Sequence, residues 1–332
     1  MEELRGSPTD EFQGLGDGRQ AMRHPPDVSP PPRAGHAVVI ANATSGQGYA
    51  DDWQHSVEEK FRRHGIEARV HLVRSGENIV SAARSAVAQG AALVVAAGGD
   101  GSVSAVASQL ADSGVTMGVL PMGTLNHFAK DLGIPLDLDD AVAVLATGNT
   151  MAVDVGEVNG RIFINNSGLG LYPDIVRDRE RQQRHLGRGK WPALLAASLH
   201  AARRYPVLSL KLEVDGQPIE RRSAFVFIGN NEYKMTGFEI GERAGLTDGK
   251  LSLYVTQRMG RFGLFRLALR ALFGRLDQAR DFDMLTARAL VVDTHKRSMR
   301  VATDGEVTLM ETPLNYRIRP GALKVLVPPA PA

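Results

Sequence analysis

Residues 92–102 read Ala92-Leu93-Val94-Val95-Ala96-Ala97-Gly98-Gly99-Asp100-Gly101-Ser102 and join an apolar run to a cluster of glycines. The apolar run is typical of a buried strand in a parallel sheet. The glycines allow a sharp turn and let bare backbone amides approach a ligand. A helix that begins near Ser102 would direct its N-terminal amides at the same place. The segment therefore predicts a strand, a glycine turn and a helix that together form an anion site.

A second glycine turn follows the next expected strand. That strand, Thr116–Leu120, leads into Pro121-Met122-Gly123-Thr124 and then into a short helix. Because ligands of open α/β sheets bind at the carboxyl edge of the strands, both turns are expected to face one ligand. The carboxylate of Asp100 is unusual in a simple phosphate site and indicates a bound cation or a proton-handling step. Gly-Gly-Asp-Gly alone is as often an ordinary turn, and it is the second turn that favours a ligand site.

These two elements, in this order, carry a resemblance to a known family. The chain resembles the catalytic domain shared by bacterial diacylglycerol kinase-like lipid kinases and sphingosine kinases, whose pattern is Gly-Gly-Asp-Gly-Thr followed by Pro-x-Gly-Thr-x-Asn-Asp-Phe-Ala. Two positions depart from it: Ser102 replaces the usual Thr and keeps the hydroxyl, and His127 removes a carboxylate that many members carry. The resemblance spans about residues 36–328 and includes Asn42–Gly46, Asp154–Gly156, Leu246–Gly249 and Asp304-Gly305-Glu306.

The composition is that of a globular protein without a strong charge bias. Hydrophobic residues make up 43% of the chain and charged residues 23%. The formal net charge of +2 gives no basic field, so nucleic acid is not an expected partner. The absence of cysteine excludes disulfides and thiolate metal sites, and the nine histidines show no paired ligand spacing. No apolar stretch reaches about 18 residues and no signal peptide is evident. The expected location is therefore the cytoplasm, with peripheral contact at the inner membrane face left open.

The pattern of apolar residues predicts three regions. Residues 1–34, rich in Gly, Pro and charge, are expected to be a disordered tail. Residues 35–152 alternate strands with helices and predict an α/β domain with a parallel sheet. Residues 153–319 show short alternating runs separated by Asn-Gly and Asp-Gly turns and predict a β-sandwich. The resemblance implies an NAD kinase/phosphofructokinase-like first domain, to which residues 320–328 return.

The individual elements follow from the same periodicities. In the first domain the expected strands are His36–Asn42, Glu67–Val73, Ala92–Ala97 and Thr116–Leu120, and the expected helices include Asp51–His64, Ile79–Ala88 and Asp137–Thr147. In the second domain the expected strands are Val153–Val158, Arg161–Asn165, Leu208–Val214, Ala224–Ile228, Leu251–Thr256, Ala289–Val292, Met299–Ala302 and Asn315–Arg319. A last apolar stretch, Ala322–Val327, can pair with either domain.

Two basic segments interrupt the β pattern, residues 177–190 and 258–276. The second contains five arginines and no acidic residue, with Phe and Leu at helical spacing between them. Such a helix binds a membrane surface or, equally well, covers the sandwich with a solvated arginine face. A lipid substrate favours the membrane. Whether the chain forms a homodimer is left open.

The resemblance implies three sets of site residues, although a single Ser, Asn or Asp is more often a turn residue. Glu306 is expected to accept the proton of the acceptor hydroxyl, with Asp304 as the alternative and Asp100 beside the phosphates. Magnesium is expected at Asp248, with the backbone near Gly245 and Lys250 and with Asp154. The nucleotide is expected to contact Asn42, Ser45, Gly46, Ser75, Gly98, Gly99, Asp100, Gly101, Ser102, Gly123, Thr124 and Asn126.

The activity expected from the resemblance is that of a lipid kinase that uses ATP and Mg²⁺. The identity of the lipid is left open among diacylglycerol, phosphatidylglycerol, a sphingoid base and a polyprenol. Neither a Walker motif nor a complete Gly-x-Gly-x-x-Gly after a strand is present. The alternatives are an NAD kinase-like or phosphofructokinase-like enzyme, which also use Gly-Gly-Asp-Gly, and a lipid- or nucleotide-binding regulator without catalysis.

Overall fold

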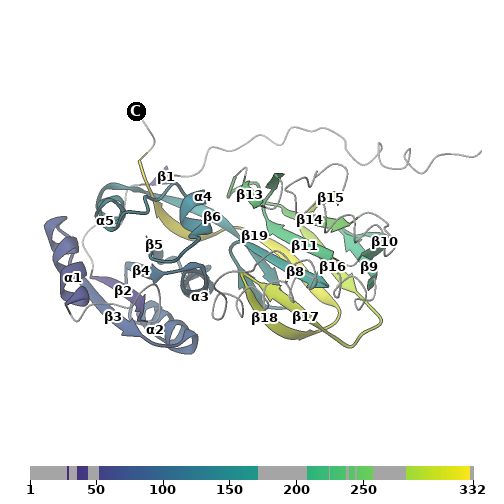
Figure 1. The fold of residues 1–332 in the computed structure, drawn as a ribbon, viewed down its shortest axis with the longest axis horizontal. Helices are drawn as coiled ribbons and strands as arrows, with labels where there is room; N and C mark the ends of the chain where they lie inside the picture. Colours follow the sequence, from purple (N-terminus) through teal and green to yellow (C-terminus); the bar gives the residue numbers. More distant parts are fainter. Residues whose placement is uncertain are drawn as a thin grey trace, which may run out of the picture.

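The fold is described by a computed structural model of the chain (Figure 1). The structure describes residues 28–29, 36–43, 52–170, 208–223, 225–236, 239–243, 245–256 and 282–329. The expected tail apart from residues 28–29, the basic segments 177–190 and 258–276, and Ser45 and Gly46 lie outside the described residues.

The first domain is built on a parallel sheet, as the sequence predicts. Its strands are adjacent in the order β5-β4-β2-β3 and all run in the same direction. All six residues of β4 are buried, which explains why this strand is apolar throughout. The strands are β2 (Ala37–Asn42), β3 (Ala68–Val73), β4 (Leu93–Gly98) and β5 (Thr116–Pro121).

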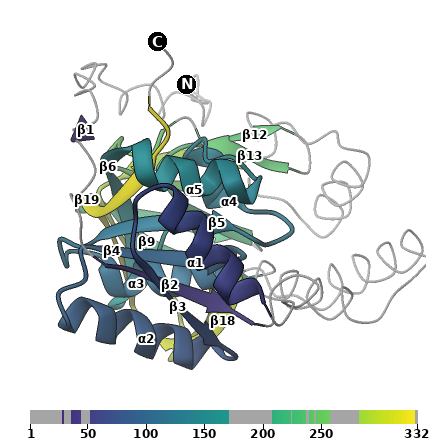
Figure 2. The same cartoon turned by 90° about the vertical axis from the view of Figure 1, so that its left-hand side faces the viewer.

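Helices cover both faces of this sheet. Helices α2 and α3 contact each other on one face, and α1 and α5 lie on the other (Figure 2). Each presents apolar side chains at helical spacing to the sheet, as Val57 and Phe61 do in α1. The helices are α1 (Trp53–Arg63), α2 (Gly76–Ala88), α3 (Asp100–Leu110), α4 (His127–Asp131) and α5 (Leu138–Thr147).

The second domain is an antiparallel β-sandwich, which confirms the predicted class. One layer is a six-stranded sheet in the order β15-β14-β11-β8-β17-β18. A core that includes Leu169, Val301 and Tyr316 lies between this layer and the other. The strands of the six-stranded sheet are β8 (Asn166–Gly170), β11 (Phe225–Asn230), β14 (Leu251–Thr256), β15 (Phe282–Ala287), β17 (Ser298–Thr303) and β18 (Glu306–Glu311).

The other layer is continuous with the sheet of the first domain. Strand β19 (Leu314–Val327) pairs with β16 in the sandwich and runs parallel to β5 in the first domain, where Lys324 lies opposite Thr116. An 11-stranded sheet therefore passes through both domains (Figure 1). Its remaining strands are β1 (Val28–Ser29), β6 (Asn149–Val158), β7 (Arg161–Phe163), β9 (Leu208–Val214), β10 (Gln217–Ser223) and β16 (Ala289–Asp293). A separate two-stranded sheet contains β12 (Tyr233–Thr236) and β13 (Glu239–Arg243).

Three details of the expected elements are wrong. The runs Asn315–Arg319 and Ala322–Val327 belong to the single strand β19, whose register against β6 shifts between Arg319 and Leu323, where Gly321 has φ 61°. The run Arg161–Asn165 is divided: β7 ends at Phe163, and β8 begins at Asn166 in the opposite layer. Strand β6 begins at Asn149, before the expected start at Val153.

None of the helices within the described part of the chain is long and apolar enough to cross a membrane.

Candidate active site

The two glycine turns lie against each other at the carboxyl edge of the sheet. Gly98 at the end of β4 pairs with Pro121 at the end of β5. A Cβ added to Gly123 would lie 2.5 Å from the Cα of Gly99, a distance that no side chain tolerates. The second turn therefore requires glycine at position 123 for its close backbone contact with Gly99.

The first turn of α3 leaves open space beside Gly101. Gly99 precedes the helix, and Asp100 is its first residue. A Cβ at Gly101 would meet nothing within 4 Å. Ser102 is buried, and its hydroxyl accepts a hydrogen bond of 3.3 Å from the side-chain amide of Asn42 at the end of β2. Backbone amides at the start of a helix can bind an anion such as a phosphate group.

Asn126 closes the second turn with its own side chain. Its Oδ1 accepts from the Gly123 N–H at 2.9 Å, and its Nδ2 donates to the Gly123 carbonyl at 2.9 Å. Asn126 is buried and has φ 52°, in the left-handed region that Asn tolerates better than most residues. The side chain thus shapes the turn, whereas the neighbouring Thr124 is exposed.

Ser75 has a structural role at the start of α2. Its hydroxyl accepts a hydrogen bond of 3.3 Å from the N–H of Asn78, and it is exposed. This is the arrangement of an N-cap. Contact between Ser75 and a nucleotide stays a prediction.

The Asp304-Gly305-Glu306 turn contacts the first domain through Asp304. This turn joins β17 to β18, and Asp304 has φ 48°. Its carboxylate accepts from the backbone N–H groups of Ile164 (2.8 Å), Asn165 (2.8 Å) and Asn166 (3.0 Å). A fourth hydrogen bond comes from the hydroxyl of Ser104, one helical turn after Asp100 on α3. Burial raises the pKa of Asp304 above its ordinary value, although these hydrogen bonds act in the opposite direction.

Glu306 lies at the start of β18 with its carboxylate at the surface. The side chain is 60% exposed and is paired with Arg161. The same guanidinium donates to the hydroxyls of Thr303 (2.8 Å) and Thr308 (3.0 Å), one on each strand of the hairpin. Glu306 is therefore held in place and accessible from solvent, whereas the Asp304 carboxylate is enclosed by its hydrogen-bond donors.

The expected metal residues lie around the turn at residues 245–250. Asp248 is exposed, and its carboxylate lies close to the backbone of Gly245. Asp154 is 2% exposed; its two carboxylate oxygens accept from the N–H groups of Gly249 (2.7 Å) and Gly321 (2.9 Å). Burial raises the pKa of Asp154.

A buried amide oxygen next to Asp154 suits a cation at this turn. Asn231 is fully buried beside the Asp154 carboxylate, and its Oδ1 has no hydrogen-bond partner among the described residues. Oxygen donors of this kind fit Mg²⁺, which also retains several waters. Within the part of the chain that the structure describes, no three His, Cys, Asp or Glu side chains gather as a ready-made site. Backbone carbonyls and water would have to complete the coordination.

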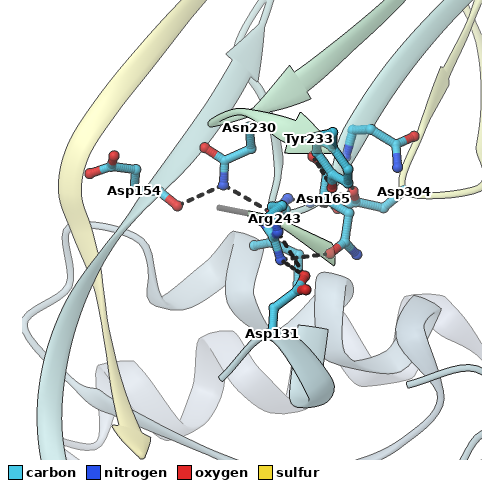
Figure 3. Close-up of polar contacts among 9 residues, drawn as sticks. Asp131, Asp154, Asn165, Asn230, Tyr233, Arg243 and Asp304 are labelled. Carbon is cyan, nitrogen blue, oxygen red and sulfur yellow. Dashed lines mark hydrogen bonds and ion pairs between the residues drawn. The ribbon is translucent and has the colours of Figure 1, made fainter. Parts of the chain in front are cut away.

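A buried network that the sequence did not reveal lies between the two domains (Figure 3). Arg243 on β13 pairs with Asp131 at the end of α4 and bonds to Ile164 and Asn165. Asn230 donates to the carbonyls of Asp154 (2.8 Å) and Ile164 (2.9 Å). Only the fold brings these residues together, because more than a hundred positions separate Asp131 from Arg243.

Comparison with known proteins identifies the family of this chain. The family model "Diacylglycerol kinase catalytic domain" matches residues 36–158, and the model "YegS C-terminal NAD kinase beta sandwich-like domain" matches residues 176–327. The diacylglycerol kinase of Bacillus subtilis (strain 168) is 30% identical over 278 residues, which cover 81% of this chain and 89% of that protein. The chain belongs to the diacylglycerol kinase-like lipid kinase family. Membership of this family makes the chain a kinase, that is, a phosphotransferase.

A second relative and a solved structure are also similar to this chain. The diacylglycerol kinase of Staphylococcus carnosus (strain TM300) is 26% identical over 225 residues, 67% of this chain and 72% of that protein. A crystal structure of a putative diacylglycerol kinase from Bacillus anthracis str. Sterne superposes with a TM-score of 0.69 at 22% identity, covering 89% of this chain and 98% of that one. That likeness shows a shared fold.

Proposed function

We propose that this protein is a lipid kinase that transfers the γ-phosphoryl group of ATP to the hydroxyl of a diacylglycerol-like lipid. The observation that supports this most strongly is the hydrogen bond between Ser104 and Asp304. It joins the helix behind the Gly98–Gly101 turn to the hairpin that carries Glu306. The nucleotide side and the acceptor side therefore meet at one place.

In this proposal the chain's own residues position the two reactants. The amides at Gly98–Gly101 and Gly123 bind the phosphates, and Asp100 lies beside them. The Glu306 carboxylate accepts the proton of the lipid hydroxyl while the hydroxyl oxygen of the lipid forms a bond to the γ-phosphorus. The bond from that phosphorus to the β–γ bridging oxygen breaks, and ADP leaves. Asp304 is the alternative proton acceptor, but its four hydrogen bonds favour Glu306 for this role.

The proposed metal is Mg²⁺, held by Asp248 and the carbonyls of Gly245 and Lys250, with Asp154 fixing the turn behind them. A bound Mg²⁺ would supply positive charge that offsets negative charge on the phosphates. Asp248→Ala should raise the Mg²⁺ concentration needed for half-maximal activity by about tenfold or more, in the range seen when metal-site residues are lost. Asp139→Ala, at an exposed position of α5, is the matched control. An unchanged Mg²⁺ requirement in Asp248→Ala would argue against this site.

The lipid acceptor implies contact with a membrane surface, and we propose residues 258–276 for it on the basis of their sequence. Anionic lipid attracts each basic residue near its surface by about 1 kcal/mol. Replacing Arg266 and Arg270 by Glu should reduce activity on anionic vesicles more than activity on a short-chain soluble lipid. Equal losses of activity on the two substrates would mean that the segment has a structural role and does not bind the membrane.

The proposed reaction can be tested with γ-labelled ATP and separate acceptors. Purified protein should label diacylglycerol or a related lipid in the presence of Mg²⁺, and Asp100→Ala should abolish the labelling. NAD offered as the acceptor distinguishes an NAD kinase-like enzyme, because label in NADP would replace label in lipid. Labelling of no acceptor would contradict the proposal and favour a binding protein.

A further inference from the structure

Arg243 joins the two domains through a buried ion pair with Asp131. Its side chain is 0% exposed, and that of Asp131 is 10% exposed. The Nε of Arg243 donates to the Oδ2 of Asp131 at 2.7 Å, and Nη2 lies 2.7 Å from the same oxygen. Arg243 comes from β13 of the second domain, and Asp131 from α4 of the first.

The two Nη atoms of Arg243 bind the segment between β7 and β8. Nη1 donates to the carbonyl of Ile164 at 2.6 Å, and Nη2 donates to the Oδ1 of Asn165 at 3.1 Å. The rings of Phe128 and Tyr233 lie 5.6 Å and 5.7 Å from the guanidinium carbon. All three guanidinium nitrogens are thus engaged, in a fork that a lysine ammonium cannot reproduce.

The segment that Arg243 binds, residues 164–166, also binds the carboxylate of Asp304. Residues 164–166 offer their backbone N–H groups to the Asp304 carboxylate, while the Ile164 carbonyl and the Asn165 side chain accept from Arg243. Figure 3 shows Asn165 next to Arg243. The hydroxyl of Tyr233 adds a bond of 3.0 Å to the Asn165 carbonyl. The position of Asp304 therefore depends on where Arg243 holds residues 164–166.

At its other end the network reaches the second glycine turn. Asp131 is the last residue of α4, a helix of five residues that starts directly after Asn126. Asn126 closes the turn at Gly123 with two hydrogen bonds. A continuous series of contacts thus runs from Gly123 through α4, Asp131 and Arg243 to Asp304.

We propose that Arg243 is a positioning residue that sets the Asp304-Gly305-Glu306 hairpin relative to the glycine turns. This inference rests on the proposed kinase function. The competing interpretation is a buried ion pair that only stabilises the fold. Replacing such a pair by apolar side chains of similar volume is often neutral or stabilising, whereas removing one partner is strongly destabilising. Because of this difference, a variant that replaces both partners can separate the effect of Arg243 on positioning from its effect on the stability of the fold.

The experiment compares Arg243→Met with the double variant Asp131→Leu/Arg243→Met. The single variant should lose both thermal stability and activity. The double variant should recover part of the lost melting temperature, because it leaves no unpaired charge, although the Ile164 carbonyl and the Asn165 Oδ1 still lose their donor. Its kcat should stay about 100-fold low, as expected for a site misplaced by about 1 Å. The KM for ATP should change little, since the glycine turns are intact. Arg243→Lys should give an intermediate kcat.

Arg317→Met is the matched control. Arg317 also pairs with a carboxylate, Glu157 at 2.8 Å, but this pair joins β19 to β6 and does not contact residues 164–166. Arg317 is 60% exposed and Glu157 keeps its second partner Arg319 at 3.1 Å, so kcat should remain within about twofold of the wild type. Recovery of kcat together with stability in the double variant would overturn the proposal.

Amide hydrogen exchange tests the positioning without any assay of activity. The N–H groups of residues 164–166 should exchange faster in the double variant, while those of β4 and β5 keep their protection. Unchanged protection at residues 164–166 would overturn the inference even if the protein is a lipid kinase. Absence of lipid phosphorylation by the wild type would instead contradict the proposed function, and the exchange result would still decide whether Arg243 holds the segment.

Discussion

At the scale of single residues, the two carboxylates of the Asp-Gly-Glu turn have different environments. Asp304 is enclosed by three backbone N–H groups and a hydroxyl, whereas Glu306 is 60% exposed and paired with Arg161. The sequence placed both in one motif and could not say which is accessible, because the surroundings of Asp304 come from residues 138 to 200 positions away. Accessibility assigns the proton-accepting role to Glu306 in our proposal.

Asp304 also gives a prediction on pH. Burial raises its pKa in the folded protein above that in the unfolded chain. The stability that this group contributes is therefore fully present below the unfolded pKa and is lost as pH rises through the folded pKa. The free energy of unfolding of the wild type, relative to that of Asp304→Asn, should decrease as pH rises from about 4, the ordinary pKa of Asp, through the raised pKa of the folded protein. Urea denaturation of both proteins across this range measures it, and a difference that increases with pH would contradict a pKa raised by burial.

The glycine turns give a matched pair of substitutions. Gly123→Ala places a Cβ 2.5 Å from the Gly99 Cα and 2.9 Å from the Asn126 Oδ1, so we expect it to cost about 1–3 kcal/mol of stability. Gly101→Ala points into free space and should leave the melting temperature almost unchanged, but it should weaken ATP binding if the phosphates occupy that space. Thermal unfolding and equilibrium ATP binding measure both effects. Equal stability of the two variants would contradict the close packing of Gly123 against Gly99.

At the scale of elements, the periodicity of apolar residues predicted most strands and helices. It missed strands whose place in the sheet is set by pairing with a neighbouring strand. The apolar run at residues 92–97 forms β4, and Asp137 caps α5 by accepting from the N–H groups of Asp139 and Asp140. Strand β10 was missed, because the alternation of Gln217–Ser223 is polar and its place is set by pairing with β9. Strand β18 was missed for the same reason; it pairs with β17, and Leu309 on it is 67% exposed.

Helix α2 gives a prediction about an element that borders the proposed site. Ser75 caps this helix, so Ser75→Ala should lower the free energy of unfolding by about 1 kcal/mol. Ser75→Asp should retain the cap, because Asp is an equally good N-cap residue. Denaturant unfolding checks the order of stability. If Ser75→Ala were as stable as the wild type, the cap would have no energetic role.

At the scale of the whole molecule, β19 ties the two domains into one structure. It pairs with β16 and β6 along its length and with β5 near its end, and Leu323 within it is fully buried. The sequence indicated that the last residues return to the first domain only through the family resemblance, since an apolar run such as Ala322–Val327 carries no information on its partner. The network around Arg243 was missed for the same reason: it is defined by contacts between domains.

The shared sheet predicts cooperative unfolding of the two domains. Leu323→Ala should cost about 2–5 kcal/mol, the usual range for deletion of a buried leucine side chain. Because β19 belongs to both domains, the amides of β4 and of β14 should lose protection together in hydrogen exchange. Calorimetry should show one transition for both proteins. Loss of protection confined to one domain would contradict this coupling.

The most direct test of the proposed mechanism separates ATP binding from phosphoryl transfer in Glu306→Gln. Nucleotide affinity and the single-turnover rate of transfer from γ-labelled ATP to diacylglycerol are measured for this variant and the wild type. If the glycine turns bind ATP and Glu306 activates the lipid hydroxyl, affinity should stay within about threefold while the transfer rate falls by about 100-fold or more. A variant that binds ATP weakly but transfers the phosphoryl group at the wild-type rate would contradict the proposed division of the site.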